Sequence, residues 1–457
     1  MKNFFHVRTT AEAKATLINA WETKPLGEEV IPITQALGRI LATKLVSPED
    51  IPPFHRSTMD GYAVRAQDTF GASEALPAIL EIIGEVHMGQ LPEKPVLRGQ
   101  TARISTGGTL PEGADACVMI EYTHLADEHT VLIERPVAPG ENVIHKGEDI
   151  HEGQIVLEAG RVLRPFEIGA MAAIGQTAAH VVKRPKIAII STGDEIVLPH
   201  KAPGPGQIRD INTYSLAASA LAAGALPFTL GIAGDEYQEV KDKVKRGLAS
   251  AGIVVVSGGS SVGARDVVVK VLEDLGPPGV LVHGVSMRPG KPVIIAICQG
   301  KPIFGLPGHP VSALTTFDVF VKFTIEHLYR CSLPEPDSAG NTVSNESGKS
   351  VPELKPQANA SEKAGVTSDP NSRERILRLQ TQPSIVEAKL GRSISSAPGR
   401  EDHIRVRLRR EAGELFADPV LGKSGLISIM VHSDGEIIVP INCEGLKTGT
   451  LVQVRIF

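Results

Sequence analysis

The stretch Val254–Asp266, VVVSGGSSVGARD, predicts the centre of the fold: a buried strand that ends at two adjacent glycines and is followed by a helix. Glycine lets a ligand approach the backbone closely, and the first turn of a helix directs unpaired N–H groups toward the same place. Three interpretations of this turn are open at first: a phosphate site, an acyl group attacked by Ser261, or a turn without a ligand.

The surrounding region, about Arg184–Arg330, alternates short apolar segments with helical ones. Strands are expected at Lys186–Ile190, Pro227–Ile232, Ile253–Val256, Val293–Ile297 and Pro302–Phe304, and helices at Asn212–Ala223, Tyr237–Ala251, Asp266–Leu275 and Val311–Arg330. This alternation predicts a parallel-rich sheet covered by helices on both faces. Ligands bind such sheets beyond the carboxyl ends of the strands, so the loops STGDE, SGGSSVGARD and LPGHP are the candidate binding loops.

The whole sequence predicts a multidomain α/β plus β protein. A helix at Ala11–Trp21 precedes short strands between about Ile51 and Val182, and the C-terminal residues predict a small β-barrel or sandwich. Residues 332–372 are rich in Ser, Pro, Glu, Gly and Asn, which is typical of a flexible linker. The expected units are an N-terminal α+β unit of residues 1–54 and 147–183, a β-rich insertion 55–146, a three-layer α/β/α unit 184–331, the linker, and a β unit 373–457.

Composition argues against several functional classes. The 457 residues carry a formal net charge of −5, which gives no general attraction for nucleic acid. The four cysteines form no C-x-x-C pair, as expected for reduced thiols in the cytosol. The N-terminus lacks a signal-peptide core, and no apolar run approaches the roughly 20 residues of a membrane span. We therefore expect a soluble, cytoplasmic protein.

The glycine turn matches neither of two common phosphate motifs. The second glycine of a G-x-G-x-x-G fingerprint is replaced by Ser260, and no G-x-x-x-x-G-K-[ST] loop occurs. Residues 259–263 do match the G-x-S-x-G of a hydrolase, with Asp266 and His309 as nominal partners of Ser261. Asp266 follows Ser261 by only five residues, however, which is awkward for orienting a distant imidazole. An anion site without a nucleophile is the favoured interpretation.

A set of motifs in fixed order resembles one known family. The motifs are PPFHRSTMDGYAVR (Pro52–Arg65), ISTGGTLPEGADACVMIE (Ile104–Glu121), GEDI, STGDEI, SGGSSVGARD, RPGKP, FGLPGHPVSA and APGRED. Together they resemble the MoeA family of molybdopterin molybdenumtransferases, to which the E domain of gephyrin is related. The resemblance implies an elongated four-domain subunit that forms a homodimer. Each active site would then lie between the α/β unit of one subunit, which binds molybdopterin, and the N-terminal part of its partner.

The resemblance also implies a reaction, in which adenylylated molybdopterin and molybdate give molybdenum cofactor and AMP. An adenylyltransferase that supplies the substrate is a candidate partner. Three alternatives stay open: an enzyme that itself performs the adenylyltransferase step, a gephyrin-like binding scaffold, and a paralogue that prefers tungstate.

Functional positions of the family can be carried over residue by residue. The implied catalytic residues are Asp60, Thr106, Asp149, Glu195, Asp235 and Asp266. The implied substrate-binding residues are Gly258, Gly259, Ser260, Ser261, Gly263, Arg288, Lys291, Pro307, Pro310, Arg405 and Ser424. The sequence departs from the family at His309, where asparagine is common, at Gly108, where alanine is common, and at Ser260, where valine is common.

The chemistry of the implied reaction explains these residue types. Arg288 and Lys291 are suited to attract molybdate and the pyrophosphate, while the backbone N–H groups of the glycine turn can hold the terminal phosphate of the pterin. The acids would repel these anions, so we expect Mg²⁺, with Asp266, Glu195 and Asp235 as candidate ligands. Which acids bind Mg²⁺ and which contact the pterin stays open. Glu195 as a helix cap and Asp60 as an Asx-turn residue are the structural alternatives.

Overall fold

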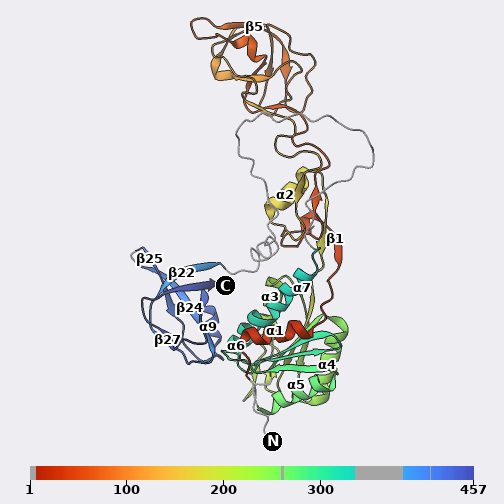
Figure 1. The fold of residues 1–457 in the computed structure, drawn as a ribbon, viewed down its shortest axis with the longest axis vertical. Coiled ribbons are helices and arrows are strands. Elements are labelled where there is room, and N and C mark those ends of the chain that lie inside the picture. Colours follow the sequence, from red (N-terminus) through yellow and green to blue (C-terminus); the bar gives the residue numbers. More distant parts are fainter. Residues whose placement is uncertain (1–6, 259–261, 335–383, 412) are drawn as a thin grey trace.

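The computed structural model describes residues 7–258, 262–334, 384–411 and 413–457, and for residues 262–266 it describes the backbone alone. The molecule is elongated (Figure 1). A β-rich unit lies at one end, a narrow waist follows, and an α/β unit and a second β unit lie at the other end. This architecture confirms the predicted multidomain α/β plus β fold class. The predicted linker, 332–372, lies almost entirely outside the described residues.

The α/β unit is built on a six-stranded sheet of order β16-β13-β17-β21-β20-β18. Its strands are β13 (Lys186–Thr192), β16 (Leu226–Ala233), β17 (Ile253–Gly258), β18 (Pro278–His283), β20 (Ile294–Cys298) and β21 (Lys301–Leu306). The first four strands in the sheet order run parallel, whereas β20 pairs antiparallel with both β21 and β18. The carboxyl ends of β13, β17 and β21 therefore meet at one edge.

Helices cover both faces of this sheet, as the alternation predicts. One face carries α1 (Thr10–Ala20), α3 (Asn212–Ala222), α6 (Pro310–Thr316) and α7 (Lys322–Cys331), and the other carries α4 (Tyr237–Ser250) and α5 (Val262–Asp274). The predicted single helix at Val311–Arg330 is wrong in one respect, because a π turn, η4 (Phe317–Val321), separates α6 from α7. The helix predicted from Asp266 begins earlier, at Val262.

The waist and the distal β-rich unit come from the first part of the chain. The waist contains α2 (Pro165–Ala173) and the antiparallel pairs β1 (Glu28–Pro32) with β12 (Ala178–Val182) and β2 (Leu45–Val46) with β11 (Ile155–Leu157). The short pair β3 (Arg56–Ser57) with β10 (Val143–Ile144) contacts the distal unit, because the Ser57 N–H donates to the Gly108 carbonyl. The distal sheet has the order β7-β4-β6-β5-β9-β8. Its strands are β4 (Gly61–Val64), β5 (Ala78–Val86), β6 (Gln100–Ile104), β7 (Ala116–Met119), β8 (Thr123–Asp127) and β9 (Thr130–Ile133).

The C-terminal unit is a small β-barrel. The strands β22 (Ile385–Leu390), β24 (Glu401–Glu411), β25 (Glu414–Pro419), β26 (Gly435–Val439) and β28 (Leu451–Ile456) close through a pairing of β24 with β26. A short helix, α9 (Ile427–Val431), follows β25, and a separate pair joins β23 (Ile394–Ser395) to β27 (Gly445–Leu446). The barrel accepts one strand from the α/β unit, β19 (Met287–Arg288), which pairs parallel with β24. This pairing ties the two units together.

The remaining short elements are β14 (Ile196–Val197), which pairs with β15 (Ile208–Arg209), and the 3₁₀ turns η1 (Ile33–Gln35), η2 (Ala66–Thr69) and η3 (Ile120–Tyr122). All four cysteines are free thiols, as predicted. None of the helices in the described part of the chain is both long and apolar enough to cross a membrane.

Candidate functional site

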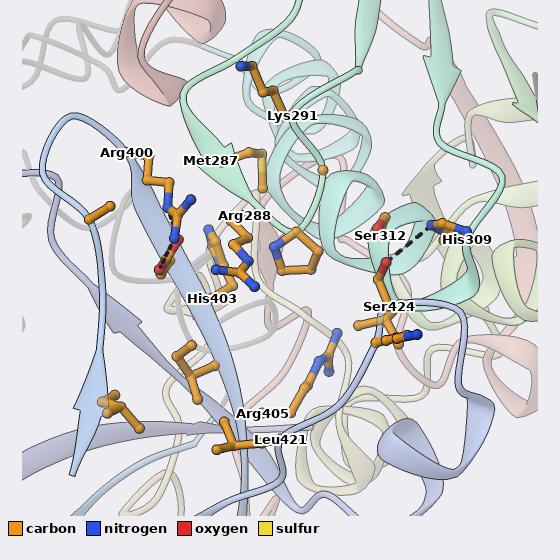
Figure 2. Close-up of a pocket in the computed structure, with 18 of the residues that line it drawn as sticks. Met287, Arg288, Lys291, His309, Ser312, Arg400, His403, Arg405, Leu421 and Ser424 are labelled. Carbon is orange, nitrogen blue, oxygen red and sulfur yellow. Dashed lines mark hydrogen bonds and ion pairs between the residues drawn. The ribbon is translucent and has the colours of Figure 1, made fainter. Parts of the chain in front are cut away.

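A cavity of about 1360 Å³ lies where the α/β unit meets the C-terminal barrel (Figure 2). The α/β unit lines it with the segments 285–292 and 307–312, and the barrel lines it with strand β24 and the turn that follows β25. The β19–β24 pairing and a hydrogen bond of 2.9 Å from the Glu401 N–H to the Ser286 carbonyl fix the junction. One continuous backbone ladder therefore forms part of the cavity wall.

The cavity is strongly basic. The cations that line it are Arg288, Lys291, Arg392, Arg400, Arg405 and Lys423. One carboxylate, Asp402, also lines it, and its Oδ1 lies 2.9 Å from Nε of Arg400. A wall with such an excess of positive charge attracts anions from solution and favours their binding in the cavity. The sequence-predicted residues Arg288, Lys291, Pro307, Arg405 and Ser424 all line this cavity.

Arg405 is the most buried of these cations. Its residue is 8% exposed, and its Nη2 donates to the Thr315 hydroxyl at 3.4 Å. The Phe457 ring lies against the guanidinium, with its centroid 4.0 Å from Cζ. Burial lowers the pKa of Arg405, while the nearby carboxylates of Glu436 and Asp318 act in the opposite direction. A guanidinium fixed on its sides in this way presents its remaining N–H groups in one direction.

A second buried charge cluster surrounds His403, which also lines the cavity. The imidazole Nε2 lies 2.9 Å from Glu401 Oε1, and Nδ1 lies 3.5 Å from Glu436 Oε2. Burial alone would lower the pKa of His403, but these two carboxylates raise it to about 9. The imidazole is therefore a cation at neutral pH, and it balances carboxylates that would otherwise repel an anion in the cavity.

The LPGHP loop after β21 forms the opposite wall. Pro307 and Pro310 are buried, and Asn212 donates from Nδ2 to the Gly308 carbonyl at 2.8 Å. His309 contacts the barrel, because its Nδ1 lies 3.2 Å from Ser424 Oγ. Figure 2 shows this contact as a dashed line between His309 and Ser424. The loop is thus fixed by two contacts, one with α3 through Asn212 and one with the barrel through Ser424.

The carboxyl edge of the sheet brings further predicted residues together. Gly258 ends β17 with φ +140°, and a Cβ there would lie 2.1 Å from the Thr192 carbonyl oxygen, so glycine alone fits this position. Glu195 and Asp235 follow β13 and β16 in the same region. Burial raises the pKa of Asp235, and the neighbouring carboxylates of Asp194 and Glu195 raise it further. This edge is a cluster of like negative charges.

Several predicted residues fall outside what the structure describes. These are Gly259, Ser260 and Ser261, together with the side chain of Asp266. Gly263 lies in the first turn of α5, whose backbone is described. Within the described residues, no group of three or more His, Cys, Asp or Glu side chains is arranged to hold a metal ion. Of the three predicted Mg²⁺ ligands, the structure describes the side chains of two, Glu195 and Asp235.

The other predicted acids, Asp60 and Asp149, lie in the N-terminal part of the chain, away from the carboxyl edge of the sheet. Asp60 immediately precedes β4, in the distal sheet, and is exposed. Its Oδ1 accepts hydrogen bonds from the Thr106 N–H at 2.7 Å and from the Thr106 hydroxyl at 3.1 Å. Asp149 is exposed, and its N–H donates to the Ile51 carbonyl at 3.1 Å. Within one chain these residues do not line the basic cavity.

Sequence reasoning missed several residues of the cavity. Arg400 lies within the quoted motif APGRED but was not singled out, and Arg392 and Lys423 lie in plain loops without a motif. His403 follows that motif directly, and His309 entered only as a nominal hydrolase partner of Ser261 and as a departure from a family pattern. The signal that could have identified His403 is a histidine that directly follows two acids, Glu401 and Asp402, at the start of a strand.

Comparisons with known proteins agree with this architecture. Residues 8–175 match the model of the MoeA N-terminal region (domain I and II), residues 188–327 match a probable molybdopterin binding domain, and residues 387–457 match the MoeA C-terminal region (domain IV). A molybdopterin molybdenumtransferase of Bacillus subtilis is 30% identical over 430 residues, 93% of this chain and 89% of its own. Its counterpart from a Nostoc species is 38% identical over 325 residues, 70% of this chain and 74% of its own.

The similarity extends to solved structures. Two crystal structures of a molybdopterin biosynthesis MoeA protein from Pyrococcus horikoshii each superpose with a TM-score of 0.75. Their identities are 33% and 27%, and they cover 98% and 99% of this chain and 99% and 100% of their own. Because the three family regions follow one another along the chain and relatives match it over most of their length, the chain belongs to the MoeA family.

Proposed function

We propose that this chain is a molybdopterin molybdenumtransferase, which inserts molybdenum from molybdate into adenylylated molybdopterin and releases AMP. The observation that carries the proposal is the basic cavity between two units of the fold. There Arg288 and Lys291 of the α/β unit meet Arg405 and Ser424 of the barrel, although more than a hundred residues separate the two pairs in sequence. Family membership independently implies the same reaction.

The cavity residues are suited to a tetrahedral dianion. A guanidinium offers paired N–H donors to oxygen atoms, and an ammonium adds a compact charge, so Arg288, Lys291 and Arg405 together offset the charge of molybdate. The Ser424 hydroxyl supplies a short-range donor. The cation of His403 keeps the two carboxylates beside it from opposing the ligand. These residues bind and orient the oxyanion before it meets the dithiolene of the pterin.

The carboxyl edge of the sheet is the proposed pterin and adenylate site. The terminal phosphate of the pterin would lie at the N-terminus of α5, where unpaired backbone N–H groups favour an anion. Glu195 and Asp235 would contribute to a Mg²⁺ site, together with Asp266. Burial, and then repulsion from Asp194 and Glu195, raise the pKa of Asp235, and carboxylates crowded together in this way are suited to a divalent cation. Bound there, Mg²⁺ would neutralise charge on the phosphoanhydride.

Asp60, Thr106 and Asp149 have no access to this edge within one chain, because they lie toward the opposite end of the molecule. We therefore propose that the active site is completed in a homodimer, in which the distal unit of one subunit faces the α/β unit of its partner. In this arrangement Thr106, held by Asp60, would face the adenylylated substrate. We also propose the division into residues 1–54 with 147–183, 55–146, 184–331 and 373–457 as the domains that support it.

The direct test is AMP release from adenylylated molybdopterin in the presence of Mg²⁺, with and without molybdate. Release that depends on molybdate establishes the transferase, whereas release supported better by tungstate than by molybdate identifies a tungstate-preferring paralogue. A folded protein that binds molybdopterin but releases no AMP would act as a scaffold, and ATP-dependent adenylylation would indicate an adenylyltransferase. The Asp266→Asn variant should keep the fold and lose AMP release. Full activity in that variant would refute its assignment.

A further inference from the structure

The contact between His309 and Ser424 joins the two walls of the basic cavity. The imidazole Nδ1 lies 3.2 Å from Ser424 Oγ, and the Val311 N–H donates to the Ser424 carbonyl at 3.2 Å. Gly425 packs at the imidazole edge, where a Cβ would lie 3.5 Å from His309 Cδ2. The loop that carries His309 is itself held by Asn212, which donates to the Gly308 carbonyl at 2.8 Å. The imidazole is therefore placed by the fold.

The direction of this hydrogen bond determines what Ser424 can offer a ligand. A serine hydroxyl has one hydrogen to donate and two lone pairs that accept. An oxyanion only accepts, so Ser424 contributes to binding only if its own hydrogen points to the ligand. Its oxygen is then able to accept from another donor, and the nitrogen 3.2 Å away is His309 Nδ1. If instead Ser424 donated to His309, its hydrogen would be lost to the ligand.

We propose that His309 is a positioning residue of the oxyanion site: its Nδ1–H donates to Ser424 Oγ and thereby leaves the Ser424 O–H to donate to the bound oxyanion. The inference rests on the proposed function, because it requires that the cavity binds molybdate or a similar tetrahedral oxyanion. Both the neutral Nδ1–H tautomer and the imidazolium can donate in this way. The role therefore depends on a donor at this position and is separate from the net charge of the imidazole.

Two substitutions of the same shape separate a donor from a mere filler. In His309→Asn the amide can donate to Ser424 Oγ, whereas in His309→Leu a side chain with the same branching has no polar atom. His309 is exposed, so both variants are expected to fold, and circular dichroism melting checks this. A third variant, His309→Ala, repeats the loss of the donor with less bulk. His432→Ala, which removes an exposed imidazole of the barrel outside the cavity, is the matched control.

The measurement is the molybdate affinity of the full chain by isothermal titration calorimetry. Ser424→Ala should weaken binding about tenfold, as expected for a lost hydrogen bond to a charged ligand. His309→Leu and His309→Ala should weaken it about fivefold, while His309→Asn should stay within about twofold of the parent. In the double variant with Ser424→Ala, the second loss should disappear, because the imidazole acts only through the hydroxyl. His432→Ala should bind like the parent.

The outcomes separate this inference from the proposed function. If the unaltered chain binds neither molybdate nor tungstate, the oxyanion site itself is refuted. If Ser424→Ala weakens binding but His309→Leu and His309→Ala do not, the site stands and the role of His309 is refuted. The role of His309 would also be refuted by additive losses of molybdate affinity in the double variant. A loss of affinity in His309→Asn as large as that in His309→Leu would refute it as well.

Discussion

Replacing Asp318 with asparagine should stabilise the protein at neutral pH. Asp318 lies in the π turn η4, beside the buried Arg405, and is itself half-buried. Burial and the nearby Glu436 raise the pKa of its carboxyl, Arg405, Lys322 and Arg455 lower it, and the net result is a pKa of about 6. The positive charges thus fail to compensate for the loss of water. The carboxylate is a net cost to the folded state at pH 7.

The size of this cost follows from the pKa. The difference between about 6 in the folded chain and 3.8 in the unfolded chain corresponds to about 3 kcal/mol. The penalty is absent below pH 3.8, where the carboxyl is protonated in both states, and is complete once the pH rises above about 6. Partial exposure screens the charge, so we expect a gain of about 1–2 kcal/mol from Asp318→Asn at pH 7.

Calorimetric melting at two pH values tests this reasoning. At about 2–4 °C per kcal/mol for a unit of this size, the Tm should rise by about 2–8 °C at pH 7. Most of the rise should vanish at pH 4. Asp242→Asn, at an exposed position on α4, is the matched control and should change neither value. A lower Tm for Asp318→Asn at pH 7 would show that the carboxylate is a net stabilising partner of Arg405 and would refute the argument.

Three further predictions concern other parts of the fold. Glu167 forms ion pairs with Arg161 and Arg164 at 2.8 and 2.7 Å, and the pKa of its carboxyl falls to about 2. Glu167→Gln should therefore lower the Tm by about 3 °C or more at pH 7. This difference in Tm should fade as the pH falls from 4.5 toward 2. Gly258→Ala places a Cβ 2.1 Å from a backbone oxygen and should destabilise by about 2 kcal/mol or more, seen as a lower Tm and weaker AMP release. Asp60→Ala should lower AMP release about 100-fold while the Tm and the molybdate affinity of the cavity stay unchanged.

Local sequence patterns predicted most of the α/β unit. The expected helix at Tyr237–Ala251 is α4, Tyr237–Ser250, because apolar residues recur along one face of a charged segment. The antiparallel hairpin between β20 and β21 was missed as such. Its turn residues Gln299 and Gly300 both have positive φ, 53° and 72°, which is the two-residue turn that joins antiparallel strands. The signal was present, but the alternation of strands and helices suggested a parallel arrangement.

Two short helices were also missed, for different reasons. At α2 the segment Arg164–Glu167 carries a proline at the first helical position and a glutamate that accepts from the Arg164 N–H at 3.1 Å, which together are a recognisable helix start. At α9 no such signal occurs, because Ile427–Val431 is a run of mostly apolar residues that reads equally well as a strand. In the folded protein α9 lies against α6, a contact that no local pattern in the sequence indicates.

The sequence predicted which residues belong to the functional site, but it did not predict which of them lie together in space. No local pattern relates Arg288 to Arg405, since their place in one cavity depends on a two-residue strand, β19, that joins a barrel far away in sequence. One feature of this geometry, the charge of Asp318, could be recognised in the sequence. Asp318 is a lone acid within the apolar run TTFDVFVKF, and a charge in such a place requires a partner or an unfavourable protonation state. The sequence thus indicated a buried charge beside the site, whereas identifying Arg405 as its neighbour required the fold of both units.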